Sequence, residues 1–571
     1  MAEDVIFADS RVSFREASLF TGRSAGRDII LLRSEGKPLP ETGLTGGQAV
    51  GNDLIFPASY ENMLTWERQL APARRLVAIN QSGYQRGFGA GNRIVLAPPD
   101  VPGLRDQSTF GGWDGIFRAL LKSAAPFWFV QQSIVRELIP EGVNPAEFPG
   151  IGHTGGYGPR ELLRAGLFAF ASQGGYTRQE LPIGADADHA IVTGRNEEAL
   201  ARSLALNKLA MEESRDYTKF TVDTCHLFDF AAPLDPLATR QVLETFRGRR
   251  FEVPNILPDQ PPFTFEFGSS EIMRLGQKYW RACAVHKELY DLAARLRGDQ
   301  PFDYELSLDE TPQPMPPREL LFYLVLLHEV MALPAGAIAS AGPNIGFTKR
   351  HDYEADPERD LWPQVNACAS ILAHFGAMLS VHSADGVRAA TGKGIGVDEV
   401  IARATGGRAE LKVADVYQEV LWQIIASSED AAEREVFVEA WRRTVEAVQQ
   451  LAGVYTGTLA DLDTADALRL LTTPAGLEQI TADYGAETAL LVQGVTGYGL
   501  PLFKLAADLE ATTDPDVPDP DAELFRRFMF LTFRSQRPAI FRALSHGTWE
   551  RFAEAVEEAT LIRLRAMGWA R

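Results

Sequence analysis

Cysteine is scarce in this chain of 571 residues, which has only three, Cys225, Cys283 and Cys368, with no two of them in a CxxC pair. That spacing excludes a disulfide-stapled scaffold and a zinc ribbon, and it is typical of a reducing compartment. No stretch approaches the roughly 18 uninterrupted apolar residues of a membrane-spanning helix. The N-terminus also lacks the basic and then apolar pattern of a signal peptide. These absences predict a cytoplasmic protein that does not cross a membrane.

The chain also has fewer basic than acidic residues. The sequence has 56 Lys and Arg against 76 Asp and Glu, which gives a net charge of −20. Such a balance repels a phosphate backbone and no basic cluster compensates for it, so we expect no nucleic-acid partner. Internal repeats of the length that builds solenoids and propellers are missing as well. The remaining composition is that of a globular protein, long enough for one large domain and a second unit.

The middle of the chain alternates short apolar runs with helix-like segments. Eight such runs end in polar or charged residues: 93–99, 127–133, 181–189, 219–226, 304–310, 338–344, 379–385 and 411–416. Strands that alternate with helices indicate a parallel sheet, and eight units favour a closed barrel over an open sheet. We therefore predict an α/β fold with a (β/α)8 TIM-type barrel over residues 76–416. Residues 1–75 would form an N-terminal cap and residues 417–571 a mainly helical C-terminal extension.

Polar side chains gather at the predicted C-terminal ends of these strands, where barrels of this type have their active sites. They are Gln131, Gln132, Asp186, Asp188, His189, Asp223, His226, Asp309, Glu310, Asn344, His382 and Asp415. Their convergence predicts a functional site at this end of the barrel.

The segment GADADHA at 184–190 carries three ionisable side chains directly after an apolar run. Within a strand, Asp186 and Asp188 share one face while His189 points to the other. Asp188 and His189 can therefore reach one site only where the chain turns, as it does at a strand end. An acidic loop with a helix-capping aspartate is the simpler alternative.

His382 has a similar place in LSVHSADG at 379–386, after an apolar pair and before a glycine-containing loop. A lone histidine is commonly structural, but His189 at another strand end favours a shared site. Two imidazoles with carboxylates are typical ligands of Mn, Fe, Co, Ni or Zn, and such a site leaves open positions for substrate oxygens. We predict a divalent metal cofactor, whose identity the residues do not specify.

Asp309 and Glu310 end the run YELSLDETPQP. Adjacent strand residues face opposite ways, which argues against a glycosidase pair of carboxylates. We expect one of them to face the site and choose Glu310, deeper in the turn, as a general acid or base; an ordinary turn before Pro312 is the alternative. The loop HDYEAD at 351–356 offers further ligands, among which the residues alone do not choose.

Three other signals do not carry function. GFGAGNR at 87–93 lacks the GxGxxG spacing and precedes a predicted strand instead of opening a helix, so it predicts no dinucleotide site. TGKGIG at 391–396 has glycine where a phosphate loop needs Ser or Thr after the lysine. Cys225 and His226 are neighbours in sequence, which rarely align as nucleophile and base, so a buried thiol is the better interpretation.

With these residues assembled, the chain resembles the bacterial tagaturonate/fructuronate epimerase family. The similarity runs intermittently from Phe88 to Val420. It rests on FGAGNRIVLAPP, FWFVQQSIVRE, GADADHA, YTKFTVDT, YELSLDET, GFTKRHDYEAD, SVHS and TGGRAELKV. The combination of QQSxxRE, GADADH and a distant VHS is specific to this family. The resemblance implies a metal-dependent isomerase that inverts one carbinol of a keto-uronate.

The resemblance also implies roles for individual residues. Asp188 would be the proton acceptor, Glu310 the proton donor, and His189 and His382 metal ligands, with Asp352 as a third ligand. Further candidates for substrate binding are Arg93, Gln132, Asp186, Asp223, Lys349 and Lys393.

The loop after His382 departs from the family pattern. It reads HSADGVRAATGKGIG where the family resembles HSGSDKFS, so a serine–lysine element is changed and Lys393 or Arg388 would replace it. The substrate could therefore be a keto-uronate, another acidic sugar or a neutral ketohexose. A metal-dependent sugar isomerase or aldolase would use the same ligands, and a non-catalytic sugar-binding barrel would bind without turnover. The expected partner is a small sugar or sugar acid, and a homo-oligomer is compatible with the sequence.

Overall fold

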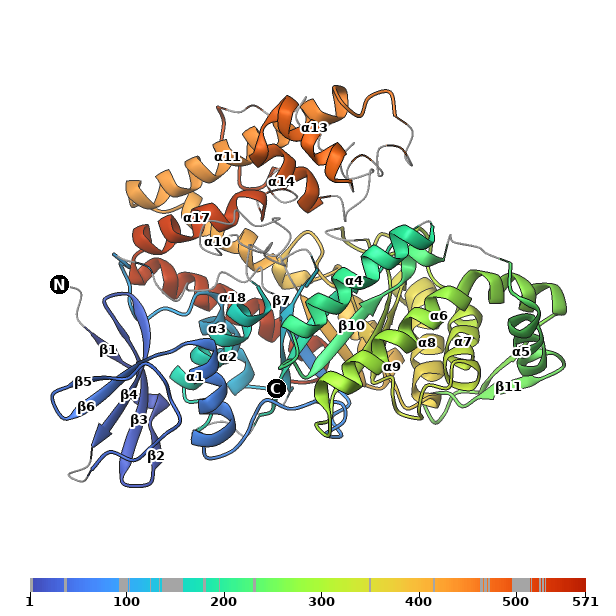
Figure 1. Ribbon diagram of the computed structural model, residues 1–571, viewed down its shortest axis with the longest axis horizontal. Coiled ribbons are helices and arrows are strands. Elements are labelled where there is room, and N and C mark those ends of the chain that lie inside the picture. The colour runs from blue at the N-terminus through green and yellow to red at the C-terminus, as the bar shows by residue number, and fades with distance from the viewer. Residues whose placement is uncertain are drawn as a thin grey trace.

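A computed structural model gives the architecture of the chain (Figure 1). It describes residues 4–570 except 35–37, 92–100, 102, 124, 133, 136–157, 178–180, 195, 229–232, 349–350, 414–415, 463–465, 467–469, 471–472, 496–513, 515, 523–524, 526–527 and 529. An N-terminal sheet lies at one end, a barrel ringed by helices lies beside it, and a group of helices from the C-terminal part packs above both.

The N-terminal sheet is antiparallel, in the order β1-β3-β4-β6-β5 with β2 paired to β3. Its strands are β1 (Val5–Ile6), β2 (Val12–Phe14), β3 (Ala17–Ser24), β4 (Arg27–Ser34), β5 (Gln48–Val50) and β6 (Asp53–Pro57). Ala25 and Gly26, with φ of 48° and 83°, join β3 to β4, as a tight hairpin turn that follows the strand twist requires. Helix α1 (Tyr60–Thr65) then begins at Ser59, whose side chain accepts from the Asn62 N–H.

Eight parallel strands close into a barrel in the order β10-β13-β14-β15-β16-β7-β8-β9. They are β7 (Gly87–Gly91), β8 (Phe127–Gln131), β9 (Ile183–Ile191), β10 (Lys219–Asp223), β13 (Asp303–Leu308), β14 (Ser340–Pro343), β15 (Met378–Val381) and β16 (Ala409–Val413). The arrangement confirms the predicted (β/α)8 fold class.

The first barrel strand lies earlier than the sequence suggested. It is the glycine-rich GFGAG at 87–91; the apolar run 93–99 lies outside the described residues. A Cβ on Gly87 would lie 1.9 Å from Cζ3 of Trp128 on the neighbouring strand. These glycines therefore make room for a large side chain inside the barrel, and they form the strand that the pattern predicted to follow them.

Helices cover the outside of the barrel. They are α2 (Gly112–Leu121), α3 (Pro159–Ser172), α4 (Glu197–Glu213), α6 (Ser269–Arg297), α7 (Pro317–Val325), α8 (Trp362–His374) and α9 (Val397–Thr405). Helix α5 (Pro236–Phe246) and the hairpin β11 (Arg250–Val253) and β12 (Phe263–Glu266) are inserted between β10 and α6. Apolar residues such as Phe220, Leu306 and Leu411 are buried on the strands, which forms the core between the strands and these helices.

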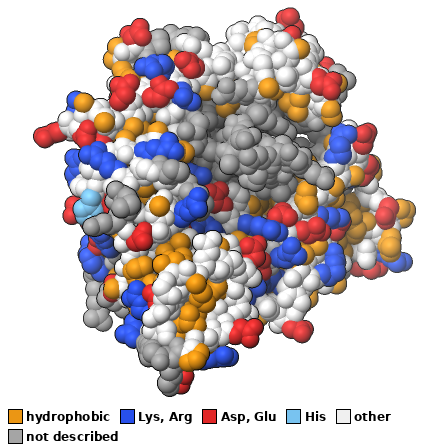
Figure 2. Space-filling model, turned by 60° about the vertical axis from the view of Figure 1, so that its left-hand side comes forward, with side chains coloured by type: hydrophobic (Ala, Val, Ile, Leu, Met, Phe, Trp, Pro, Cys, Tyr) orange, Lys and Arg blue, Asp and Glu red, His pale blue; other side chains and the backbone are white. Residues whose placement is uncertain are grey.

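The helices after the barrel are α10 (Val416–Ala426), α11 (Ala431–Thr456), α13 (Pro474–Tyr484), α14 (Ala486–Val495), α17 (Phe530–Ala543) and α18 (His546–Ala566). Among the described helices, none has the length and apolar character that crossing a bilayer requires. On the described part of the face in Figure 2, basic side chains stand interspersed with acidic ones, so neither sign forms an extended field there.

Candidate metal and catalytic centre

A bulge in strand β9 brings Asp188 and His189 to the same site. The pairing of β9 with β10 shifts between Phe220 and Val222, so that the β9 strand has one residue more than its partner at this point. His189 has a φ of 59°, a left-handed conformation inside an otherwise extended strand. Such a bulge re-aims a side chain that regular alternation would direct away. His189 Nε2 therefore lies 3.9 Å from Asp188 Oδ1.

His189, Asp309 and His382 form a first group whose potential ligand atoms all lie within 4.8 Å of one another. The two imidazole centroids are 5.6 Å apart. Between the rings, Ser307 Oγ lies 3.4 Å from His189 Nε2 and 3.5 Å from His382 Nδ1. Two imidazoles and one carboxylate at this spacing form a donor set that suits a divalent transition metal.

Glu305, in strand β13, fixes the orientation of the His382 ring. His382 Nε2 donates to Glu305 Oε1, and Nδ1 lies 3.0 Å from Asp309 Oδ1. A carboxylate behind a metal-binding histidine orients the ring and leaves the other nitrogen for the metal. Burial lowers the pKa of His382, but Asp309 and Glu305 outweigh it and raise the pKa to about 10. Because a histidine ligates in its neutral form, a bound cation would take the place of the Nδ1 proton.

Asp223 and Glu310 form a second group around the other side of His189, again with ligand atoms within 4.8 Å. Glu310 Oε1 lies 3.7 Å from His189 Nδ1. Burial raises the pKa of Asp223, and the charge of Glu310 raises it further. Asp309 and Glu310 both face the site, contrary to the expectation that only one would, because strand β13 ends at Leu308 and strict alternation no longer holds beyond it.

Lys412, from strand β16, is a cation at this centre that the sequence pattern did not single out, and its side chain is only 10% exposed. Its Nζ lies 2.7 Å from Asp186 Oδ2, 3.1 Å from Asp188 Oδ1 and 3.0 Å from Glu305 Oε1. Burial alone would raise the pKa of Asp188, but His189, Lys412 and His382 lower it below its usual value. His189 and Lys412 therefore favour the ionised form of Asp188, which is the form that the expected role of proton acceptor requires.

A second set of buried charged side chains lies deeper in the barrel, next to Lys412 and its partners. Lys219, fully buried in β10, is paired with Glu305 and Glu410 and lies 3.9 Å from Asp186. Asp186, a candidate for substrate binding, is itself fully buried and accepts from Thr221 Oγ1 at 2.8 Å. Its position is thus inside the barrel, beneath Asp188, in a network of alternating charges.

Asp352, expected as a third metal ligand, does not belong to either group. It is exposed, and its Oδ1 accepts from the backbone N–H of Val387 at 2.8 Å. Asp309 takes its place beside the two histidines. Strand ends lie at fixed positions around the barrel, whereas the loop at 351–356 had no spacing that could place it.

The other candidates for substrate binding have different surroundings. Lys393 is buried, and its Nζ donates to the carbonyls of Thr348 and His351, so it ties two loops together. Gln132 follows β8 and is half-buried, with an Oε1 that is buried and has no hydrogen-bond partner among the described residues. Arg93 and Lys349 lie outside the described residues.

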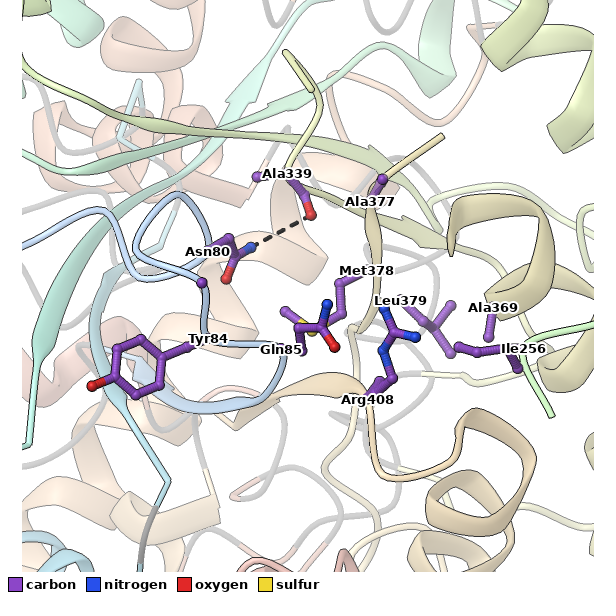
Figure 3. A pocket seen from close by; sticks show the side chains of 12 residues that line it. Asn80, Tyr84, Gln85, Ile256, Ala339, Ala369, Ala377, Met378, Leu379 and Arg408 are labelled. Atoms are coloured by element: carbon purple, nitrogen blue, oxygen red, sulfur yellow. Dashed lines mark hydrogen bonds between the residues drawn. The ribbon is translucent and has the colours of Figure 1, made fainter. Parts of the chain in front are cut away.

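A cavity of about 90 Å³ lies at the opposite end of the barrel (Figure 3). Ala339, Met378 and Arg408 line it, and they lie at or just before the N-terminal ends of β14, β15 and β16. In Figure 3, Asn80 points to the Ala339 carbonyl. Active sites of barrels form at the C-terminal strand ends, so this cavity is separate from the centre around His189.

Comparisons with known proteins identify a family and agree with the fold. A family model described as UxaE, tagaturonate epimerase, matches residues 159–460, more than half of the chain. The native crystal structure of fructuronate-tagaturonate epimerase UxaE from Cohnella laeviribosi is 18% identical, with a TM-score of 0.60 over 99% of this chain and 97% of that one. A glycerol complex of the same enzyme is also 18% identical, with a TM-score of 0.57 over 99% and 96%. No curated protein matches the sequence.

Proposed function

The chain belongs to the tagaturonate epimerase family, and on that premise we propose that it is a cytoplasmic, metal-dependent epimerase that inverts one carbinol of a keto-uronate at the centre around His189. The observation that carries the proposal is the placement of two carboxylates at opposite nitrogens of one imidazole. Asp188 Oδ1 lies 3.9 Å from Nε2 and Glu310 Oε1 lies 3.7 Å from Nδ1 of His189. Inversion requires one group to remove a proton and another to return it from the opposite face.

His189, His382 and Asp309 would hold the metal. Their donor atoms lie close enough to share one ion, and Glu305 orients His382 from behind. A bound divalent ion would supply Lewis-acid polarisation of the substrate ketone. With Asp309 as the third ligand, Glu310 and Asp223 stay on the other side of His189, where they can contact substrate.

The chain's own groups then divide the proton transfers. Asp188, held ionised by Lys412, accepts a proton, and Glu310 donates one. If the inverted carbon is next to the ketone, the proton comes directly from that carbon. If the carbon is one position further, direct deprotonation is not activated, and cleavage and re-formation of a carbon–carbon bond replaces it, with the same two groups serving hydroxyl protons.

Removing and restoring the metal tests the proposal. We expect chelator-treated protein to be inactive and Mn, Ni, Co or Zn, added separately, to restore interconversion of tagaturonate and fructuronate, followed by NMR. Neutral ketohexoses serve as the comparison. Turnover of ketohexoses alone would mean that the changed loop after His382 has changed the substrate, and protein that neither binds metal nor forms product would contradict the proposal.

The same NMR experiment in deuterated water separates the two routes. Direct deprotonation places solvent deuterium on the inverted carbon, because Asp188 keeps the proton it removes and Glu310 delivers a deuteron that it has taken from the solvent. Bond cleavage and re-formation leaves that carbon unlabelled. Unlabelled product would rule out the deprotonation route while leaving the epimerase itself intact.

The ligand set is tested by a matched pair of aspartates. We expect Asp309→Asn to weaken metal affinity by at least the about 10- to 100-fold that results when a group supporting a metal ligand is altered, because Asp309 is itself a proposed ligand and the amide carries no charge. Asp352→Asn should leave the affinity within about twofold, since Asp352 only accepts from the Val387 N–H. Competition with a fluorescent chelator measures both, and the reverse order of effects would restore Asp352 as the ligand.

A further inference from the structure

Helix α18 stands where the barrel needs its eighth helix. After β16 the described chain continues through α10, α11, α13, α14 and α17 before α18 begins at His546. Helix α18 then packs against α2 and α9, the helices that follow β7 and β15, and against α10. In the barrel order, the strands between these positions are β16 and β7. The helix therefore covers the seam at which the barrel closes, and in Figure 1 it lies beside α2 and β7.

The contact between α18 and α2 is unusually close. A Cβ on Gly115 of α2 would lie 2.4 Å from the Ala553 carbonyl oxygen and 2.7 Å from Val556 Cβ. Trp569 Nε1, just beyond α18, donates to the Gly407 carbonyl at 3.1 Å, at the turn that leads into β16. Helix α18 is thus packed into the barrel wall along its length.

Arg563 extends from α18 to the loop that follows His382. It is only 2% exposed, and its guanidinium binds both carboxylate oxygens of Asp398, in the first turn of α9, with Nη2 at 3.0 Å from Oδ1. The same Nη2 donates to the Ala384 carbonyl at 3.3 Å. Ala384 is the second residue after His382, so Arg563 joins the start of this loop to the helix that ends it.

The loop passes directly over the guanidinium. Gly392 has a φ of 51°, and a Cβ there would lie 2.5 Å from Arg563 Cζ. On its other side the loop is held by Asp352, which accepts from Val387, and by Lys393, whose carbonyl accepts from the Tyr353 N–H at 2.7 Å. The segment that departs from the family pattern is therefore clamped between α18 and the loop at 351–353.

We propose that Arg563 is a positioning residue of the epimerase, which from helix α18 fixes the loop after His382 and thereby sets both the ring of His382 and the opening for the polar end of the substrate. The inference rests on the proposed function, since it assigns this loop to substrate selection. It gives part of the C-terminal region a role in the reaction, although α18 contributes no side chain to the two groups around His189.

The test compares Arg563→Met with Glu550→Gln. Glu550 lies on the same helix and pairs with Arg118 of α2 at 2.9 Å, so its change weakens the docking of α18 without touching the loop. We expect Arg563→Met to raise KM for the keto-uronate about tenfold while kcat falls much less, and to weaken metal affinity about 10-fold, the lower end of the effect of groups behind a metal ligand. Glu550→Gln should change neither. Arg563→Lys keeps the charge but not the two-point contact with Asp398, so its KM and metal affinity should lie between those of the wild type and Arg563→Met.

Trypsin supplies a readout that does not depend on turnover. Arg388 is exposed in the loop, and cleavage after it should be about tenfold faster in Arg563→Met than in Glu550→Gln if the clamp is lost. Circular dichroism checks that each variant is folded, and Asp398→Asn carries the same comparison if Arg563→Met does not fold. If Arg563→Met and Glu550→Gln showed equal cleavage rates, metal affinities and KM values, the inference would be overturned. Inactive wild-type protein with faster cleavage and weaker metal binding in Arg563→Met would instead refute the proposed reaction and leave the clamp standing.

Discussion

Replacing Asp188 by Asn is expected to lower kcat for keto-uronate epimerisation by about 10²- to 10⁴-fold, the usual contribution of a positioned acid or base. The amide has the same shape and can still accept from Lys412, which lies 3.1 Å from Asp188 Oδ1, but it cannot accept a proton from substrate. KM should change much less, because the side chain is no larger. Initial rates by NMR on protein loaded with metal measure the effect.

Asp186→Asn is the matched control for this change. Asp186 lies on the same strand and also contacts Lys412, at 2.7 Å, but it is fully buried beneath the site. If the charge around Lys412 mattered more than proton transfer, both variants would lose a similar factor in kcat. An Asp188→Asn protein that keeps more than a tenth of the wild-type kcat would exclude Asp188 as the proton acceptor.

The second large effect is expected from Lys412→Met. Removing this cation leaves Asp186, Asp188 and Glu305 buried without it, and breaking a buried charge pair costs about 3–5 kcal/mol of unfolding free energy. Loss of Lys412 also raises the pKa of Asp188, which the lysine holds down. The acidic limb of the kcat/KM profile should therefore move to higher pH. Denaturant titration and the pH profile measure the two consequences separately.

Lys219→Met provides the comparison for Lys412. It removes a fully buried lysine that pairs with Glu305 and Glu410 and has no contact with Asp188 among the ion pairs of the described residues. Both variants should unfold at lower denaturant concentration, but only Lys412→Met should shift the acidic limb by the direct loss of a charge beside Asp188. An unshifted profile in folded Lys412→Met protein would mean that Lys412 serves stability alone.

The sequence predicted the barrel and the positions of both histidines because these depend on local patterns. Apolar runs that end in charged residues mark strand ends. His382 directly follows β15, whereas His189 lies inside β9 (Ile183–Ile191), before the strand ends. Asp188 and His189 reach the same site because of a bulge in β9. The sequence predicted that the chain must turn near these residues, but it did not show where or how. Asp309 was not predicted as a metal ligand because strict alternation of side chains does not hold beyond Leu308, the last residue of β13.

The sequence of three barrel strands does indicate that the interior of the barrel is charged. KFTVD, YELSL and AELKV alternate polar and apolar residues, with Lys219, Glu305 and Lys412 all on the polar face. The prediction from the sequence uses them only as short apolar runs that end in polar residues. Their pairing across the barrel could not be foreseen, because it depends on the register between strands that are far apart in the sequence.

The position of helix α18 has a consequence for how the protein is made. The ribosome completes all eight barrel strands by Val413, but the helix that covers the seam between β16 and β7 begins only at His546. At ordinary rates of synthesis this interval lasts on the order of ten seconds. During that time the nascent chain already contains His189 and His382, while Ala553 and Val556, which later pack against α2, have not yet been added. The side chains proposed for catalysis are therefore translated well before helix α18, and until then the seam between β16 and β7 lacks the helix that covers it.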